Sequence, residues 1–103
     1  MNQVSNLIND RGNAAANQFV IRDGKKTVFQ SYRSRIACKK DGYGGTVTIV
    51  PEAVQPRGET LQSSNTTRKH LYIFLRNHCG MCIYNIDDLK AAIKNGAIKV
   101  RHF

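Results

Sequence analysis

The chain has 103 residues, 41% of them hydrophobic and none of them Trp, which fits a single globular domain with a modest core. Sixteen Lys and Arg against seven Asp and Glu give a formal net charge of +9, which favours polyanionic partners such as DNA, RNA or an acidic protein surface. No apolar run approaches membrane-spanning length, and three cysteines, an odd number, argue against a secreted disulfide framework.

The N-terminal residues are polar and rich in Ala. Val4, Leu7 and Ile8 have helical spacing, so we expect a flexible or short helical segment over residues 1–16 and a single α+β domain over residues 17–103. The first residues lack the basic-then-apolar order of a signal peptide. We therefore expect a cytoplasmic protein.

The next part of the chain reads as strands joined by turns. Residues 18–21 form a first strand, and Asp23-Gly24 is typical of a hairpin turn, because Gly accepts the positive φ that such turns need. Residues 41–45 form a looser turn. The alternation of Thr and β-branched residues over 46–50 predicts another strand.

The basic stretch between these turns, residues 25–40, forms one long bent strand or two strands. A single flat strand cannot bury both Phe29 and Ile36, because alternate residues point to opposite faces. We expect a bulge or bend near residues 31–34 that changes the register by one. The two arginines of the stretch would leave that bend on the solvent side.

The second half of the chain predicts two helices. After a loop over residues 51–64, the hydroxyl-rich segment 63–67 offers N-cap candidates for a helix that reaches about His78 and ends at Gly80. Asn85 then caps a second helix, with acidic residues in its first turn. Gly96 ends that helix, and the alternation that follows predicts a last strand.

This order of elements predicts an α+β fold, with an antiparallel sheet of about four strands and two helices packed on one face. Strands and helices are segregated along the chain, whereas a parallel fold would alternate them. The apolar positions of each element predict the following core: Phe19, Ile21, Ile36, Val47, Ile49, Leu71, Phe74, Leu75, Leu89 and Ile93.

The sequence gives little sign of metal or catalytic chemistry. Cys79 and Cys82 have the C-x-x-C spacing of half a zinc site, but a second such pair is absent. We expect small residues of an interhelix turn, with no metal and no cofactor. The adjacent Asp87 and Asp88 read as helix-start charges, and no nucleophile or phosphate-loop motif is present. We predict that the protein is not an enzyme.

Basic, aromatic and hydroxyl side chains outside the predicted core point to nucleic acid. Arginines beside aromatic residues suit a phosphate backbone, and a helix N-terminus rich in hydroxyls suits one phosphate. Simple helix capping and a solvated basic face explain the same residues. The nucleic-acid-binding candidates are Arg33, Arg35, Lys39, Ser64, Thr66, Thr67, Arg68, Lys69, Tyr72 and Arg76.

Four segments of the chain, NQFVI, VFQSYRSRIA, TTRKHLYIFL and IDDLKAAIKNGAIKV, carry a recognisable pattern. It resembles a small domain of unknown function found in phage and mobile-element proteins, with an F-Q-S-Y strand and a T-T-x-K helix start. The resemblance spans about residues 17–101. It implies a phage origin and a location in the host cytoplasm.

Two functions follow from these observations. The first is a small basic protein that binds DNA or RNA through the phosphate backbone with little sequence specificity. The alternative is a phage-encoded inhibitor of a host defence system, like an anti-CRISPR protein, which would bind an acidic or nucleic-acid-binding surface of a host defence protein.

Overall fold

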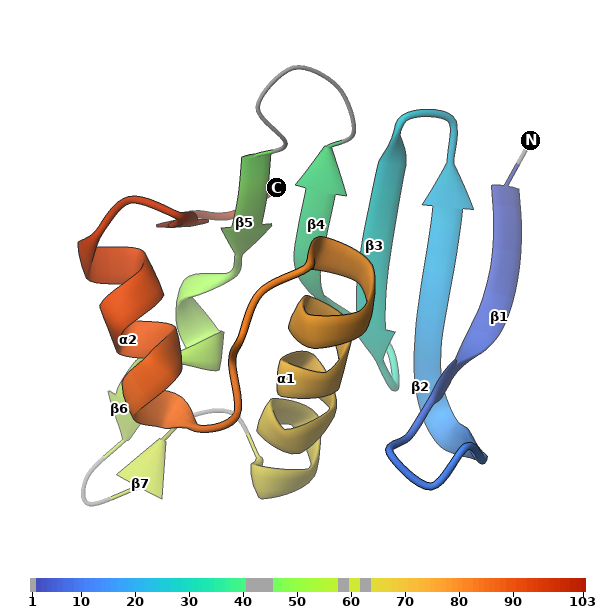
Figure 1. The fold of residues 1–103 in the computed structure, drawn as a ribbon, viewed down its shortest axis with the longest axis horizontal. Coiled ribbons are helices and arrows are strands. Elements are labelled where there is room, and N and C mark those ends of the chain that lie inside the picture. Colours follow the sequence, from blue (N-terminus) through green and yellow to red (C-terminus); the bar gives the residue numbers. More distant parts are fainter. Residues whose placement is uncertain (1, 41–45, 58–59, 62–63) are drawn as a thin grey trace.

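A mixed sheet with two helices on one face forms the framework of the computed structural model (Figure 1). The structure describes residues 2–40, 46–57, 60–61 and 64–103. The elements are β1 (Asn2–Ile8), β2 (Ala14–Asp23), β3 (Lys26–Ser31), β4 (Ser34–Lys40), β5 (Thr46–Ile49), a 3-10 turn η1 (Pro51–Ala53), β6 (Pro56–Arg57), β7 (Thr60–Leu61), α1 (Asn65–Cys79), α2 (Ile86–Lys94) and β8 (Ile98–Val100).

The order of strands in the main sheet is β1-β2-β3-β4-β5-β8, and β6 pairs with β7 in a separate two-stranded ribbon. The first five strands form an antiparallel meander. The last strand, β8, runs parallel to β5. The α+β class with both helices on one face is confirmed, while the sheet has six strands and is mixed.

The parallel strand follows from the path of the chain after β5. The chain passes through η1, the β6–β7 ribbon, α1 and α2 before it returns to the sheet beside β5. A long crossover of this kind brings a strand back in a parallel orientation, whereas a tight hairpin cannot. The predicted turn at residues 41–45, between β4 and β5, lies outside the described residues.

The expected N-terminal helix is wrong, because these residues form β1 and pair with β2. Of the three apolar residues with helical spacing, only Leu7 is fully buried, while Val4 and Ile8 are 62% and 48% exposed. A strand places alternate side chains on opposite faces. Leu7 therefore fixes β1 to the core, and Val4 falls on the other side.

The predicted irregularity in residues 25–40 is present. A turn at Tyr32 and Arg33 separates β3 from β4, and the register shifts because Phe29 faces Ala37 while Gln30 faces Arg35. Ile36 is the extra residue. Both Phe29 and Ile36 are buried, because the turn reverses the chain and, with Gln30 facing Arg35, leaves Ile36 on the face of Phe29. The stretch therefore forms two strands, with a tight turn rather than a bulge near residues 31–34 and a register shift further along β4.

Seven of the ten predicted core residues are buried, and Phe19, Ile21 and Ile93 are partly buried. The pairing of Val20 with Phe29 puts Val20 and Gln18 beneath the helices. Phe19 and Ile21 therefore lie on the opposite face of the sheet. Phe29 also packs on Phe74 of α1, with ring centroids 5.6 Å apart, which joins the sheet to the helical layer.

Capping residues determine where the two helices begin and where α1 ends. Ser64 caps α1, since its side chain accepts a hydrogen bond from Thr67 N, and Gly80 ends the helix with a left-handed φ of 67°. Asn85 caps α2 by accepting from Asp88 N. Within the described part of the chain, neither helix has the length and apolar character needed to cross a membrane.

Candidate nucleic-acid interface

A hollow of about 750 Å³ opens where the β3–β4 turn meets the start of α1, both toward the lower end of the sheet in Figure 1. We call it the Arg33/Arg35 groove. Its lining residues are Gln30, Ser31, Tyr32, Arg33, Ser34, Arg35, Ile36, Val50, Glu52, Ala53, Ser64, Thr67, His102 and Phe103.

The β3–β4 turn places the two arginines at the rim of the groove. Arg33 belongs to the turn and Arg35 to the first residues of β4, and both side chains are exposed. The arginines are therefore available to a ligand in the groove. Guanidinium groups at such a rim suit phosphate oxygens, because they donate two parallel hydrogen bonds and keep their charge.

Tyr32 has an unusual backbone conformation, with a positive φ of 55°. Two hydrogen bonds hold it: Tyr32 N donates to Asn17 O over 2.7 Å, and Gln30 Nε2 donates to Tyr32 O over 2.9 Å. A positive φ is costly for a side chain larger than Gly. The result is an aromatic ring held at the turn with 54% of the residue exposed.

The start of α1 supplies the hydroxyls of the groove. Ser64 Oγ donates to Thr67 Oγ1 over 3.0 Å, and Thr67 Oγ1 lies 3.0 Å from Ser31 Oγ of β3. No acidic residue occupies the first turn of α1. The positive end of the helix dipole therefore faces the groove without a carboxylate on that turn to offset it.

Among the described residues that line the groove, one side chain is acidic. Glu52 of η1 lies with its Oε1 3.3 Å from Nε2 of His102. Two arginines and the helix N-terminus outweigh this single negative charge. The groove is electropositive and lies at a helix start, a combination that binds phosphate in many proteins.

Behind the groove lies a buried polar side chain. Gln18 of β2 faces Ser31 in the β2–β3 pairing and is fully buried. Neither atom of its side-chain amide has a hydrogen-bond partner within the described structure. Buried amides are normally paired, and this residue has no part in the sequence-based prediction.

Two predicted contact residues make internal contacts instead. Lys39 Nζ donates to His78 O over 3.1 Å at the end of α1. Arg76 donates to Ile83 O over 2.8 Å and forms an ion pair with Asp10 over 3.0 Å. Both side chains are partly buried by these contacts, and their role in nucleic-acid binding stays a prediction.

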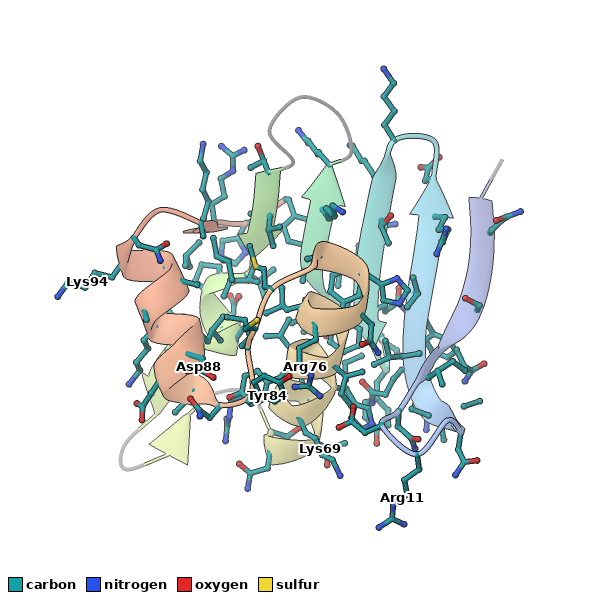
Figure 2. All side chains as sticks on the ribbon, in the orientation of Figure 1. Arg11, Lys69, Arg76, Tyr84, Asp88 and Lys94 are labelled. Atoms are coloured by element: carbon teal, nitrogen blue, oxygen red, sulfur yellow. The ribbon has the colours of Figure 1, made fainter. Side chains whose placement is uncertain are left out.

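Arg76 is also covered by an aromatic ring. Its guanidinium lies 4.5 Å from the ring centroid of Tyr84, and Figure 2 shows the two side chains next to each other in front of α1. This stacking is a cation–π contact. Arg76 thus ties α1 to the segment before α2.

The remaining candidates lie along α1, outside the groove. Thr66 is exposed, and its carbonyl oxygen lies 2.7 Å from His70 Nδ1. Arg68 donates to Asn65 Oδ1 and hydrogen-bonds Tyr72, whose pKa is raised by burial and lowered again, in smaller part, by Arg68. Lys69 is exposed and lies beside the β1–β2 turn.

The uncovered face of the sheet adds basic residues that the sequence-based prediction did not include. The strand pairings put Lys26, Lys40 and Lys99 on the face opposite the helices, with Arg35 on the same face. Lys26, Arg35 and Lys99 each stand next to a buried residue of the same strand. A correct assignment of the strand register from the sequence would have placed these basic residues on one face of the sheet.

The three cysteines differ in burial. Cys38 is buried, Cys79 is partly buried and Cys82 is exposed. Burial raises the pKa of the Cys38 thiol, although Lys26, Lys40 and Arg35 act to lower it. Across the residues that the structure describes, no three His, Cys, Asp or Glu side chains gather closely enough to hold a metal ion.

These features define a two-layer α+β protein with an electropositive groove at one end of its sheet. The chain belongs to DUF8033, a family of unknown function whose model matches residues 2–87. The matched span contains both arginines of the groove and the start of α1. No curated protein and no solved structure gives a significant match to the chain.

Proposed function

We propose that this protein binds nucleic acid through its phosphate backbone, with the Arg33/Arg35 groove as the primary contact. The observation that carries the proposal is a meeting of two separate segments. The arginines of the β3–β4 turn and the N-terminus of α1, with Ser64 and Thr67, line the same hollow. Each segment alone is an ordinary surface feature, whereas together they offer charge and hydrogen-bond donors to one phosphate.

The chemistry of the groove supports binding with little sequence preference. Its donors are the guanidinium groups and the first backbone N–H groups of α1, which have no partner within the helix. Both suit phosphate oxygens, which carry no sequence information. Tyr32, exposed at the turn, adds a ring on which a base of any kind can stack, worth roughly 1–3 kcal/mol per base. A stacked base must be unpaired, so we expect single strands to bind at least as well as duplexes.

The remaining charge supports binding beyond the groove. Arg35 belongs both to the groove and to the open face of the sheet, where Lys26, Lys40 and Lys99 also lie. A strand held in the groove would pass from Arg35 onto this basic face. We therefore expect a site of several phosphates rather than one.

Fluorescence anisotropy with short single- and double-stranded oligonucleotides tests the proposal. Because binding releases counterions, the logarithm of the association constant should fall linearly with the logarithm of the salt concentration. The slope should be about −0.9 per duplex phosphate contacted, or about −0.7 per phosphate of a single strand. No binding at about 50 mM salt, where such contacts are tightest, would contradict the proposal.

A pull-down from cell lysate separates this function from the inhibitor of a host defence system. If nucleic acid bridges the protein to its partners, nuclease treatment should release those partners. A stoichiometric protein partner that survives both nuclease and high salt would contradict the proposal and favour the inhibitor. The phage origin that the sequence resemblance implies stays a prediction.

A further inference from the structure

A second, smaller hollow lies between α1 and the chain that leads into α2. Its volume is about 370 Å³, within the range of roughly 300–1,000 Å³ that pockets for small molecules span. We call it the Tyr84 pocket. Four of the side chains that line it carry the argument: Arg68, Lys69 and Tyr72 of α1, and Tyr84 of the segment before α2.

Tyr84 gives the pocket an exposed aromatic ring that other residues hold in place. Tyr84 N donates to Asp88 Oδ2 over 3.0 Å, and the Arg76 guanidinium lies 4.5 Å from the centroid of the ring. Arg76 is itself held by Asp10 and by Ile83 O. Despite these contacts, 67% of Tyr84 is exposed. A ring that is both held and open to solvent is suited to stacking.

The wall that α1 contributes to the pocket is cationic. Arg68 donates to Asn65 Oδ1 and hydrogen-bonds Tyr72, contacts that keep its guanidinium beside the pocket, and Lys69 is exposed. Among the described residues that line the pocket, two are basic and none is acidic. A cationic wall beside an aromatic ring matches a nucleotide, which has a phosphate to pair and a base to stack.

The Tyr84 pocket and the Arg33/Arg35 groove share the first turns of α1. Ser64 and Thr67 line the groove, whereas Asn65 and Arg68 line the pocket. Because an α-helix has 3.6 residues per turn, these two pairs lie on neighbouring faces of the same part of the helix. A single strand held in the groove can therefore continue around the start of α1 into the pocket.

We propose that the Tyr84 pocket holds one unpaired nucleotide of the strand that the Arg33/Arg35 groove binds, with its base on Tyr84 and its phosphate at Arg68 and Lys69. The inference rests on the proposed function and deepens it. A base reaches the pocket only when it is unpaired, so the protein should bind single strands more tightly than duplexes. The strand then has two stacking residues, Tyr32 at the groove and Tyr84 in the pocket.

Fluorescence anisotropy with two single strands of equal length tests the stacking. One strand carries thymine bases, and the other is abasic, with the same phosphates and sugars but no bases. Tyr84→Leu keeps an apolar side chain and removes the ring. This variant should bind the thymine strand roughly 5–150-fold more weakly than the wild type does, equivalent to about 1–3 kcal/mol for one stacked base. Both proteins should bind the abasic strand equally.

Lys69→Ala tests the phosphate contact, and Lys94→Ala is the matched control, since both lysines are exposed and Lys94 points away from the rest of the molecule in Figure 2. With the thymine strand, Lys69→Ala should make the slope of the logarithm of the association constant against the logarithm of the salt concentration shallower by about 0.7, one single-strand contact. Lys94→Ala should keep the slope of the wild type. Equal slopes for the two variants would contradict the phosphate position.

Failure of this inference and failure of the proposed function give different results. A wild type that binds neither strand at about 50 mM salt would overturn both. A wild type that binds, together with a Tyr84→Leu variant that binds the thymine strand as tightly or loses affinity for both strands alike, would overturn the Tyr84 pocket as a nucleotide site. The Arg33/Arg35 groove would then stand without it.

Discussion

Gln18 sits between the sheet and the start of α1, fully buried and with both amide atoms unpartnered in the described structure. Leaving a buried polar group unpaired costs about 1–3 kcal/mol, whereas replacing it by an apolar group of the same shape is neutral or stabilising. Neighbouring Ser31 differs, because its hydroxyl is within hydrogen-bond distance of Thr67. The two residues therefore form a matched pair for a test.

Gln18→Met keeps a long unbranched side chain and removes the amide. We predict that the free energy of unfolding, measured by urea titration, stays unchanged or rises by about 1–2 kcal/mol. Ser31→Ala, the control, should lower it by about 0.5–1.5 kcal/mol through the lost hydrogen bond. A loss of more than about 1 kcal/mol in Gln18→Met would show that the amide has a partner, such as an ordered water.

His78 makes the stability of the fold depend on pH. Burial lowers its pKa from the usual value of 6.5, and Arg22 and Lys39 act in the same direction. Below about pH 6.5 the unfolded chain takes up a proton that folded His78 resists. The contribution of His78 to stability is therefore fully present above this pH and is lost as the pH falls through 6.5 toward the lower, folded-state pKa.

We predict that the free energy of unfolding falls between about pH 7 and about pH 5.5 in the wild type. His78→Phe keeps an aromatic ring against Phe74, whose centroid lies 5.3 Å from the His78 ring, and removes the titrating group. This variant should show a shallower dependence in parallel urea titrations. Identical slopes for the two proteins would show that His78 does not carry the effect.

Each face of α1 has a different role. Leu71 and Phe74 are fully buried against the sheet, while Lys69 is exposed. The helix α1 packs against β3 and β4, the strands whose turn carries the arginines of the Arg33/Arg35 groove. The packing of α1 thus sets the position of its N-terminus relative to the arginines.

Leu71→Ala should lower the free energy of unfolding by about 2–5 kcal/mol, because it removes a side chain from a packed core and leaves a cavity. Lys69→Ala on the exposed face of the same helix should change it by less than about 0.5 kcal/mol. Denaturant titration of both variants checks this. A loss below about 1 kcal/mol for Leu71→Ala would show that the wrong face of α1 has been assigned to the core.

Arg76 joins three segments through its guanidinium, namely α1, the β1–β2 turn at Asp10 and the chain before α2 at Ile83 and Tyr84. Arg76→Lys keeps the charge but loses the planar fork. We predict a loss of about 1–3 kcal/mol in the free energy of unfolding, measured by urea titration. A change of less than about 0.5 kcal/mol would contradict this role of Arg76 in joining the segments.

At the scale of the whole molecule, features set by neighbouring residues could be predicted from the sequence. Gly24, with a φ of 60°, opens the β2–β3 turn one residue after the expected start at Asp23, Gly80 ends α1 and Asn85 caps α2, each for a reason that acts within a few residues. The need to bury both Phe29 and Ile36 also predicted a break in the strand near residues 31–34, where the β3–β4 turn lies.

Features set by distant contacts could not be predicted in this way. The strand β1 exists because Leu7 reaches the core, and β8 becomes parallel because the chain returns beside β5. The choice of Val20 rather than Phe19 for the buried face depends on the pairing of β2 with β3. Helical spacing and strand alternation do not contain this information.

In the candidate site, too, local features could be predicted and long-range contacts could not. The sequence predicted both halves of the groove, the arginines of residues 25–40 and the hydroxyls at the start of α1, but as separate features. Their meeting depends on the contact between Ser31 and Thr67, 36 residues apart. The internal roles of Lys39 and Arg76 likewise depend on partners far along the chain.

The comparison of two double variants tests the central claim most directly. Arg33→Ala with Arg35→Ala removes two charges from the groove, and Lys90→Ala with Lys94→Ala removes two from α2. Both lysines are exposed, and Lys94 points away from the rest of the molecule in Figure 2. Net charge changes equally in the two proteins, so any difference in binding reports position.

Fluorescence anisotropy at several salt concentrations gives the slope of the logarithm of the association constant against the logarithm of the salt concentration. In the arginine variant this slope should be shallower by the equivalent of about one to two phosphate contacts. Each contact contributes about 0.9 for a duplex or about 0.7 for a single strand. The lysine variant should keep the slope of the wild type. Equal slopes for the two variants, or no binding by the wild type at about 50 mM salt, would contradict nucleic-acid binding at the Arg33/Arg35 groove.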